Sequence, residues 1–157
     1  MHKTRNDIPE KIRERVVALL NARLADSVDL MHQAKQAHWN VKGPAFIALH
    51  KLFDEIVDEA EEYMDLLAER VVQLGGVAEG TVRIAARNST LAEYPLSLVA
   101  ERDHVEALSA ALATYAGAIR RAIDQCDELG DKGTADIFTE ISRGADKYLW
   151  FVEAHLG

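Results

Sequence analysis

The sequence predicts an all-α protein built as a four-helix bundle, with one long connection between its second and third helices. Apolar residues recur at helical spacing through four long segments, and no segment shows the alternation typical of a β-strand. The chain has 157 residues, enough to bury one sizeable core. We therefore expect a single domain over residues 1–157, in which residues 1–7 form a short N-terminal tail.

Signals at the ends of the periodic segments set the expected helices, which cover residues 8–39, 45–74, 97–130 and 134–156. The first begins where Asp7 and Glu10 have the spacing of a capping box, and Pro9 suits a first helical turn. The sequence "VKGP" ends it. Gly75 and Gly76 stop the second helix, because glycine is typical of a helix C-terminus.

The lengths of the connections decide the topology. The first and third connections are only a few residues long, so each joins two antiparallel neighbours. The middle connection, residues 77–95, lacks clear periodicity but has room for a short helix, and it can span about 60 Å when extended. It can therefore run the whole length of the bundle. One long crossover in a four-helix bundle is the ferritin-like arrangement.

Composition and charge exclude several classes of function. The formal net charge is −8, which argues against a constitutive nucleic-acid binder and favours cations as ligands. The N-terminus lacks the apolar core of a signal peptide, and no run of about 20 apolar residues could span a bilayer. We therefore expect a cytoplasmic protein with no membrane partner. The single cysteine, Cys126, cannot form an intrachain disulfide and is expected to be buried.

The second helix carries candidate metal ligands as two pairs with i, i+4 spacing, His50 with Asp54 and Asp65 with Glu69. Both pairs lie on one face and flank the apolar stripe. His50 and Glu69 lie about 28 Å apart along the axis, so one metal ion cannot contact both. The pairs are symmetric about a point between residues 59 and 60. A two-fold axis there would bring an antiparallel copy of the helix alongside and complete two identical sites from half-sites.

His38 extends the first of these pairs. It lies at the end of the first helix, just before the turn, and can lean over the start of the second helix beside His50. Nitrogen ligands next to carboxylates suit iron, manganese or zinc better than calcium or magnesium. The plain alternative is a helical scaffold whose carboxylates are only surface groups, and it leaves the paired spacing unexplained.

Other polar groups have ordinary explanations. Five carboxylates of the second helix are expected to form a solvated acidic face: Glu55, Asp58, Glu59, Glu61 and Glu62. Glu101 and His104 form one Glu-x-x-His motif of the kind found inside di-iron bundles, but no second copy exists, so we expect a structural role. His32 lies on a different side of the first helix from His38 and should not share its site.

Four stretches of the sequence, "KQAHWNVKGPAFIALH", "LFDEI", "MDLLAERVVQLGG" and "ADIFTEISRGADKYLWFVE", resemble the Dps family, the DNA-protection-during-starvation mini-ferritins. The resemblance covers nearly everything after residue 7, and its histidines, carboxylates and closing glycines stand at the family's spacing. It implies a ferritin-like fold and a hollow homododecamer with tetrahedral symmetry.

The resemblance also implies a ferroxidase site at the two-fold interface, made from His38, His50 and Asp54 of one subunit and Asp65 and Glu69 of the partner subunit. There Fe(II) is oxidised to Fe(III), with hydrogen peroxide preferred over oxygen, and ferric mineral is stored inside the cage. Consuming ferrous iron and peroxide together suppresses hydroxyl-radical formation and so protects DNA. Neighbouring Trp39 matches a tryptophan that could quench oxidising equivalents, and a packing role fits it equally well.

Two further features of the family apply less directly. Acidic three-fold pores admit iron, and the candidate pore residues here are Asp127, Asp131 and Asp136, although Lys132 stands where some relatives are acidic. DNA-compacting relatives often carry a long lysine-rich tail, whereas this chain has only "MHKTR" there. We expect DNA binding to be weak or absent. The alternative from another class is a non-enzymatic, nucleoid-associated protein that coats DNA.

Overall fold

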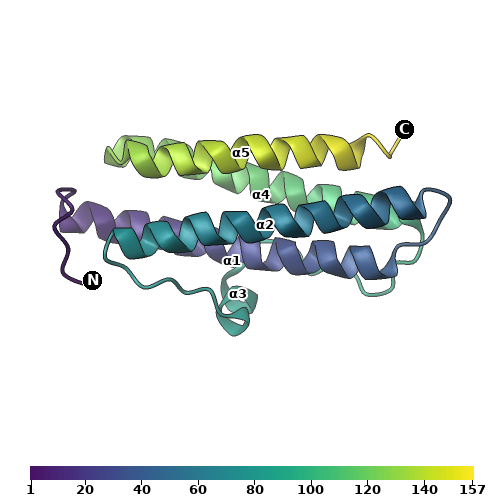
Figure 1. Cartoon of the computed structure of the whole chain (residues 1–157), viewed down its shortest axis with the longest axis horizontal. Helices are drawn as coiled ribbons and strands as arrows, with labels where there is room; N and C mark the ends of the chain where they lie inside the picture. The colour runs from purple at the N-terminus through teal and green to yellow at the C-terminus, as the bar shows by residue number, and fades with distance from the viewer.

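A computed structural model describes all 157 residues and contains five helices (Figure 1). They are α1 (Glu10–Asn40), α2 (Phe46–Gln73), α3 (Val82–Asn88), α4 (Glu101–Leu129) and α5 (Lys132–Glu153). The four long helices form a bundle, and the short α3 lies within the connection from α2 to α4 (Figure 1). The predicted fold class is confirmed, including the short helix in the crossover.

Contacts at one end of the bundle show how the crossover runs. Lys42, in the turn between α1 and α2, forms an isolated parallel β-bridge with Ala100, just before α4. The helix α4 therefore begins beside the α1–α2 turn, at the opposite end from the last residue of α2 (Figure 1). At that far end, Gly75 adopts a left-handed conformation with φ +85°, which stops α2 as the sequence predicted.

Each of the four long helices starts one to four residues from its predicted position, and contacts explain the shifts of the third and fourth. The third long helix begins at residue 101 instead of 97, because Ala100 is held in the bridge and the Glu101 N–H donates to the Lys42 carbonyl over 3.1 Å. The fourth begins two residues earlier than expected, right after Asp131. The Asp131 carboxylate accepts the Thr134 N–H over 3.0 Å and so caps the helix.

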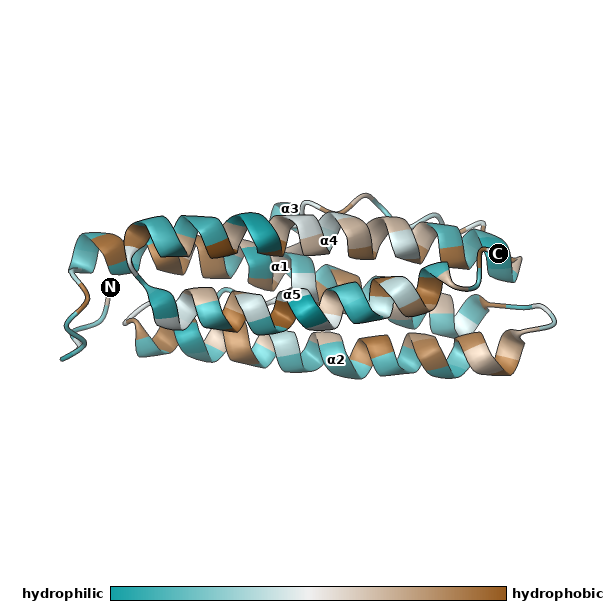
Figure 2. Ribbon diagram, turned by 90° about the horizontal axis from the view of Figure 1, so that it is seen from above, coloured by the Kyte–Doolittle hydropathy of each residue, from teal (hydrophilic) through white to brown (hydrophobic).

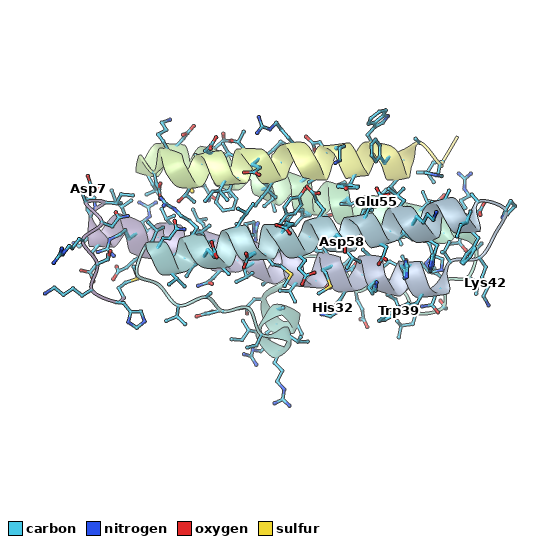
Figure 3. All side chains as sticks on the ribbon, viewed as in Figure 1. Asp7, His32, Trp39, Lys42, Glu55 and Asp58 are labelled. Carbon is cyan, nitrogen blue, oxygen red and sulfur yellow. The ribbon has the colours of Figure 1, made fainter.

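The capping box predicted for the first helix is wrong. The helix begins at Glu10, and the residue at its N-cap position is Pro9, which has no side-chain acceptor. The Pro9 carbonyl instead accepts the N–H groups of Ile12 and Arg13, at 2.9 and 3.0 Å. Asp7 lies outside the helix and is exposed at the other end of the bundle from Lys42 (Figure 3).

The core is one cluster of 36 buried residues to which all five helices contribute. Its largest fully buried side chains include Tyr115, Phe53 and Phe138. Figure 2 shows hydrophobic and hydrophilic residues alternating around each long helix, as an amphipathic bundle requires. Cys126 is buried, as predicted. None of the helices combines the length and the apolar character needed to cross a membrane.

Candidate metal centre

The histidines predicted to bind metal, His38 at the end of α1 and His50 near the start of α2, stack with ring centroids 3.7 Å apart. His38 Nδ1 lies 2.7 Å from the His50 carbonyl, and His50 Nδ1 lies 2.9 Å from the His38 carbonyl. A carbonyl oxygen can only accept, so both Nδ1 atoms carry the hydrogen. In a neutral ring, Nε2 then carries the lone pair that can bind a metal ion. A hydrogen bond to the backbone fixes the orientation of each ring, as in many metal-binding histidines.

Asp54 lies one turn after His50 and completes this half of the site. Its carboxylate forms an ion pair with the Lys35 ammonium from α1 and lies 3.8 Å from His38 Nδ1. The hydrogen bond from Lys35 is the main cause that lowers the pKa of Asp54; desolvation opposes it, and the charges of Lys35 and the two histidines lower the pKa further. Asp54 is therefore ionised at neutral pH, and a cation already neutralises it.

Lys35 contacts a predicted site residue but was not itself predicted. It lies one turn before His38 on α1, and this i, i−3 spacing was the available signal. Spacing alone does not show that the lysine reaches across to α2, because that depends on how the two helices pack.

The other predicted ligands, Asp65 and Glu69, lie farther along α2, and both are exposed. Since α2 is unbroken from Phe46 to Gln73, the separation of about 28 Å between His50 and Glu69 holds. No group of three or more His, Cys, Asp and Glu side chains within the chain is arranged to hold a metal ion. One chain therefore places the two predicted halves apart and contains no complete site.

The Glu101–His104 motif has structural partners. Glu101 Oε2 accepts the Ala45 N–H over 2.9 Å, which fastens the start of α4 to the α1–α2 turn. His104 is 1% exposed, and its Nδ1 lies 2.7 Å from the Tyr94 hydroxyl. The two side chains thus engage different neighbours instead of converging on one point.

The three candidate pore residues differ in their surroundings. Asp131 is 2% exposed, and its carboxylate binds the Arg70 guanidinium and the Thr134 hydroxyl as well as capping α5. Asp127 is exposed and pairs with Lys132 over 2.6 Å, and Asp136 is also exposed. Both carboxylate oxygens of Asp131 thus accept hydrogen bonds from within the chain, whereas Asp127 and Asp136 are exposed and have oxygens that a cation could reach.

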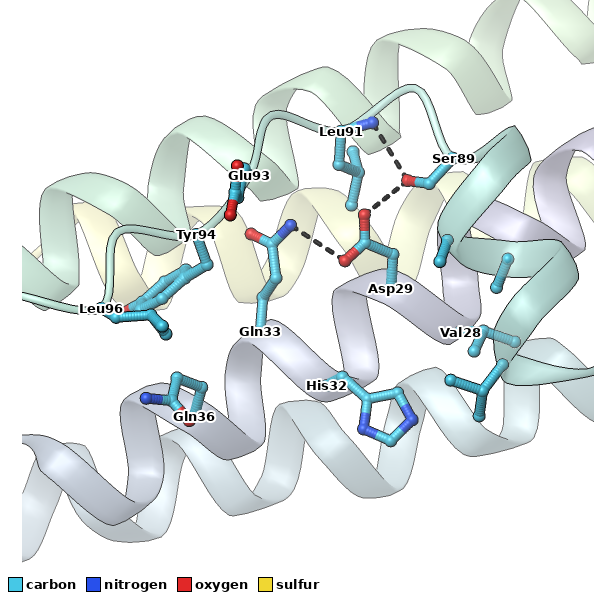
Figure 4. Close-up of a pocket in the computed structure, with 13 residues that line it drawn as sticks. Val28, Asp29, His32, Gln33, Gln36, Ser89, Leu91, Glu93, Tyr94 and Leu96 are labelled. Atoms are coloured by element: carbon cyan, nitrogen blue, oxygen red, sulfur yellow. Dashed lines mark hydrogen bonds between the residues drawn. The ribbon is translucent and has the colours of Figure 1, made fainter.

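Two residues of α1 near the half-site face outward. Trp39 is 66% exposed, next to His38, and Figure 3 shows it on α1 along with His32. His32 lines a pocket of about 570 Å³ between α1 and the crossover, opposite Ser89, Leu91 and Tyr94 (Figure 4). As predicted, His32 does not join His38. Along α2, Glu55 and Asp58 are solvated (Figure 3).

A four-helix bundle with one long crossover is the ferritin-like arrangement, and comparisons with known proteins agree. The family model described as a ferritin-like domain matches residues 17–157. A DNA protection during starvation protein from Agrobacterium fabrum is 47% identical over 155 residues, which are 99% of this chain and 96% of that protein. Another from Brevibacillus brevis is 34% identical over 92% of this chain and 97% of that protein.

Solved structures of Dps proteins have the same fold as this chain. Dps from Microbacterium arborescens in a high-iron form has a TM-score of 0.88 and 33% identity, covering 98% of this chain and 97% of that one. Mycobacterium smegmatis Dps has a TM-score of 0.94 and 29% identity, covering 99% and 94%. The chain belongs to the Dps family. Proteins of this family form dodecamers, bind iron, and generally oxidise and store it and protect DNA.

Proposed function

We propose that this protein is a ferroxidase and iron-storage cage that oxidises Fe(II), preferentially with hydrogen peroxide, stores ferric mineral and so protects DNA. The observation that carries the proposal is the division of the ligand set along the unbroken helix α2. Preoriented imidazoles lie at one end and exposed carboxylates at the other, with a symmetric spacing that a second copy would complete. A cytoplasmic location and iron entry past Asp127 and Asp136 belong to the same proposal.

The proposed site takes Fe(II) as its substrate at an interface between two chains. One chain supplies His38, His50 and Asp54, and the partner chain supplies Asp65 and Glu69. Two neutral imidazoles and three carboxylates give the site a formal charge of −3. That charge stabilises a pair of iron ions and stabilises Fe(III) more than Fe(II), because the attraction grows with the charge of the ion. Oxidation is thereby favoured in the site.

Peroxide suits a site that holds two ferrous ions. Reducing one hydrogen peroxide to two waters consumes two electrons and two protons, and two Fe(II) ions supply both electrons. No one-electron product is then released, so hydroxyl radical does not form. The stacked imidazoles and the carboxylates keep both ions bound until both electrons have moved.

A mixture of two variants tests whether the site spans two chains. One variant carries His38→Ala, His50→Ala and Asp54→Ala, and the other carries Asp65→Ala and Glu69→Ala. Each alone should fold, because the replaced groups lie off the buried core, and each should lose most of its fast Fe(II) oxidation. Cages refolded from an equal mixture should recover up to roughly a quarter of wild-type activity. Random pairing makes about half the dimers mixed, and each mixed dimer regains one site.

The control replaces two exposed carboxylates of α2 outside both halves, Glu55→Ala and Asp58→Ala, and should retain most activity. Mass spectrometry must show both chains in the mixed cages. A mixed rate no higher than the average of the two parent variants would refute the shared site. Activity lost in the control variant as well would show that α2 acts through its total charge rather than through these ligands.

A further inference from the structure

We propose that Tyr94 and His104 form a buried electron donor, which supplies one electron and holds the released proton when peroxide meets a site containing a single Fe(II). The inference rests on the proposed ferroxidase function and extends it to the case in which iron is scarce. It assigns a role to a tyrosine and a histidine outside the ligand set.

The geometry of the pair suits proton-coupled electron transfer. The Tyr94 hydroxyl lies 2.7 Å from His104 Nδ1, the rings lie nearly parallel at 20°, and the two residues are 8% and 1% exposed. His104 Nε2 is buried and has no hydrogen-bond partner. If Nδ1 carried the hydrogen, both the Tyr94 O–H and the Nε2 lone pair would be unsatisfied. If Nε2 carries it, only one group is unsatisfied, so Tyr94 donates to Nδ1.

Burial makes this histidine a reversible proton acceptor. Desolvation lowers the pKa of His104, and the Leu98 carbonyl and Asp103 oppose that shift only in part. The ring is therefore neutral at physiological pH, with its Nδ1 lone pair free to take the phenol proton. The dry surroundings disfavour the imidazolium, so the proton returns to the phenoxyl oxygen when an electron comes back.

The pair lies at the same end of the bundle as the histidine half-site. His104 is in the first turn of α4, whose start is bonded to Lys42 in the turn between α1 and α2. Tyr94 lies on the crossover, over the part of α1 that contains Gln33 and Gln36 (Figure 4). Neighbouring helix axes are about 8–10 Å apart, so the pair is on the order of 10–15 Å from His38. Electrons cross such distances through packed protein.

Other tyrosines of the bundle are less suited. The Ser27 hydroxyl donates to the Arg23 carbonyl, so Tyr115 must donate to Ser27, and a serine hydroxyl is a poor proton acceptor. Tyr63 donates to the Glu59 carboxylate over 3.0 Å, a longer hydrogen bond than that of Tyr94. Among the hydrogen bonds of the structure, Tyr94 alone pairs a tyrosine with a histidine.

The proposed step balances. One Fe(II), one hydrogen peroxide and two solvent protons react with the hydrogen-bonded Tyr94–His104 pair. The products are Fe(III), two waters, a Tyr94 phenoxyl radical and a His104 imidazolium. The iron and the tyrosine each lose one electron, and these two electrons break the O–O bond of the peroxide. Each oxygen keeps its hydrogen and takes one solvent proton, so two waters form without release of hydroxyl radical. A later Fe(II) reduces the phenoxyl, His104 returns the proton, and a second Fe(III) forms.

The test uses assembled wild-type cages loaded anaerobically with one Fe(II) per site and mixed with one equivalent of hydrogen peroxide. Samples frozen after milliseconds are examined by electron paramagnetic resonance, and Fe(III) is measured in the same samples. We expect a tyrosyl signal that narrows when tyrosine is ring-deuterated, with a coupling to nitrogen in protein grown with ¹⁵N-histidine. Tyr94→Phe should lose most of the signal and release more spin-trapped hydroxyl radical, whereas the control Tyr115→Phe should match wild type.

The outcomes separate this inference from the function on which it rests. No Fe(III) in wild type refutes both. Normal Fe(III) without a tyrosyl signal, or a signal that Tyr94→Phe retains, refutes the electron donor alone. The ¹⁵N-histidine measurement needs no substitution, so an absent coupling refutes the assignment even if Tyr94→Phe fails to fold. If the Tyr94–His104 hydrogen bond had only a structural role, a folded Tyr94→Phe cage would release no more hydroxyl radical than the wild type, and that result would refute the electron donor.

Discussion

At the scale of single residues, hydrogen bonds to the backbone fix the orientation of the two histidines of the proposed site. His38 and His50 each donate Nδ1–H to the other's carbonyl, so neither ring must reorient to offer Nε2. The one group that a metal ion must displace is the Lys35 ammonium on Asp54. In the proposed site, Lys35 would therefore compete with Fe(II) for the Asp54 carboxylate.

Replacing Lys35 with methionine should tighten metal binding at the histidine half-site. The Asp54 side chain is 44% exposed, so the ion pair contributes about 0.2–1 kcal/mol, and removing it should raise affinity by up to about five-fold. Titration with Co(II), whose absorption reports bound ligands, gives the affinity. Lys11→Met removes the same charge from an exposed site in the first turn of α1 and should change little. Weaker Co(II) binding in Lys35→Met would show that the lysine positions Asp54.

The residue scale shows what sequence could and could not predict. The spacing of His50, Asp54, Asp65 and Glu69 along one helix was readable, because a helix converts sequence separation into distance and direction. The reciprocal bonds of His38 and the reach of Lys35 were not readable. Both depend on side-chain rotamers and on the contact between α1 and α2, which no local pattern encodes.

At the scale of elements, α5 packs closely against α2 at Gly144. A Cβ atom there would lie 1.9 Å from the Tyr63 hydroxyl oxygen and 3.1 Å from Glu59 Oε1. Tyr63 is 5% exposed and stacks on Tyr115 with centroids 6.2 Å apart, so it has little room to move. The glycine thus allows the two helices to pack around a buried tyrosine.

Gly144→Ala should therefore destabilise the protein despite the better helix propensity of alanine. Overpacking costs about 1–3 kcal/mol, which exceeds the gain of about 1 kcal/mol from the propensity. The matched control is Gly117→Ala in α4, where the nearest atom would be Arg121 Nη1 at 3.5 Å, and it should be neutral or stabilising. Urea unfolding followed by circular dichroism gives both values. A more stable Gly144→Ala would mean that Tyr63 moves aside freely.

Helix boundaries were predictable to within a few residues, and the largest error has a long-range cause. Gly75 and Gly130 end their helices with positive φ, a local signal that sequence carries. The late start of α4 instead follows from the pairing of Ala100 with Lys42, far away along the chain. The crossover was predicted from its length, since only a long connection can return to that end.

At the scale of the whole molecule, the four tyrosines of the chain link stability to alkaline pH. Burial raises the pKa of Tyr63, Tyr94, Tyr115 and Tyr148. An unfolded tyrosine loses its proton near pH 10, whereas the folded protein keeps it. The free energy of unfolding should thus begin to fall near pH 9, where the Cys126 thiol of the unfolded chain ionises, because burial raises the pKa of that thiol to about 12 in the folded protein. It should fall more steeply above pH 10, by up to about 1.4 kcal/mol per pH unit for each tyrosine.

Urea midpoints measured between pH 8 and 11 check this dependence, with phenolate absorbance followed in parallel. Tyr115→Phe should reduce the slope above pH 10, because one titrating group is lost. Phenolate absorbance that rises with a midpoint near pH 10 while the helices persist would contradict the prediction.

The assembled cage should bind DNA weakly at physiological salt. A shell of subunits with a net charge of −8 repels phosphate, and the tail offers only Lys3 and Arg5. The His2 N–H also donates to the Gly75 carbonyl over 2.6 Å, which fastens the start of the tail to the end of α2. Gel-shift titrations should show little retardation. Strong, salt-resistant shifts that vanish on deleting residues 1–6 would show that many short tails act together.

The distance between the two predicted ligand pairs on α2 also makes the proposed activity depend on the pairing of two chains. If neither half oxidises iron alone, a newly made or damaged chain that has no partner does not oxidise iron. Activity on dilution should then fall with the square of the free chain concentration, as for any site assembled from two molecules. The helix would thus confine the oxidation to chains that have already paired, by geometry alone and with no separate regulator.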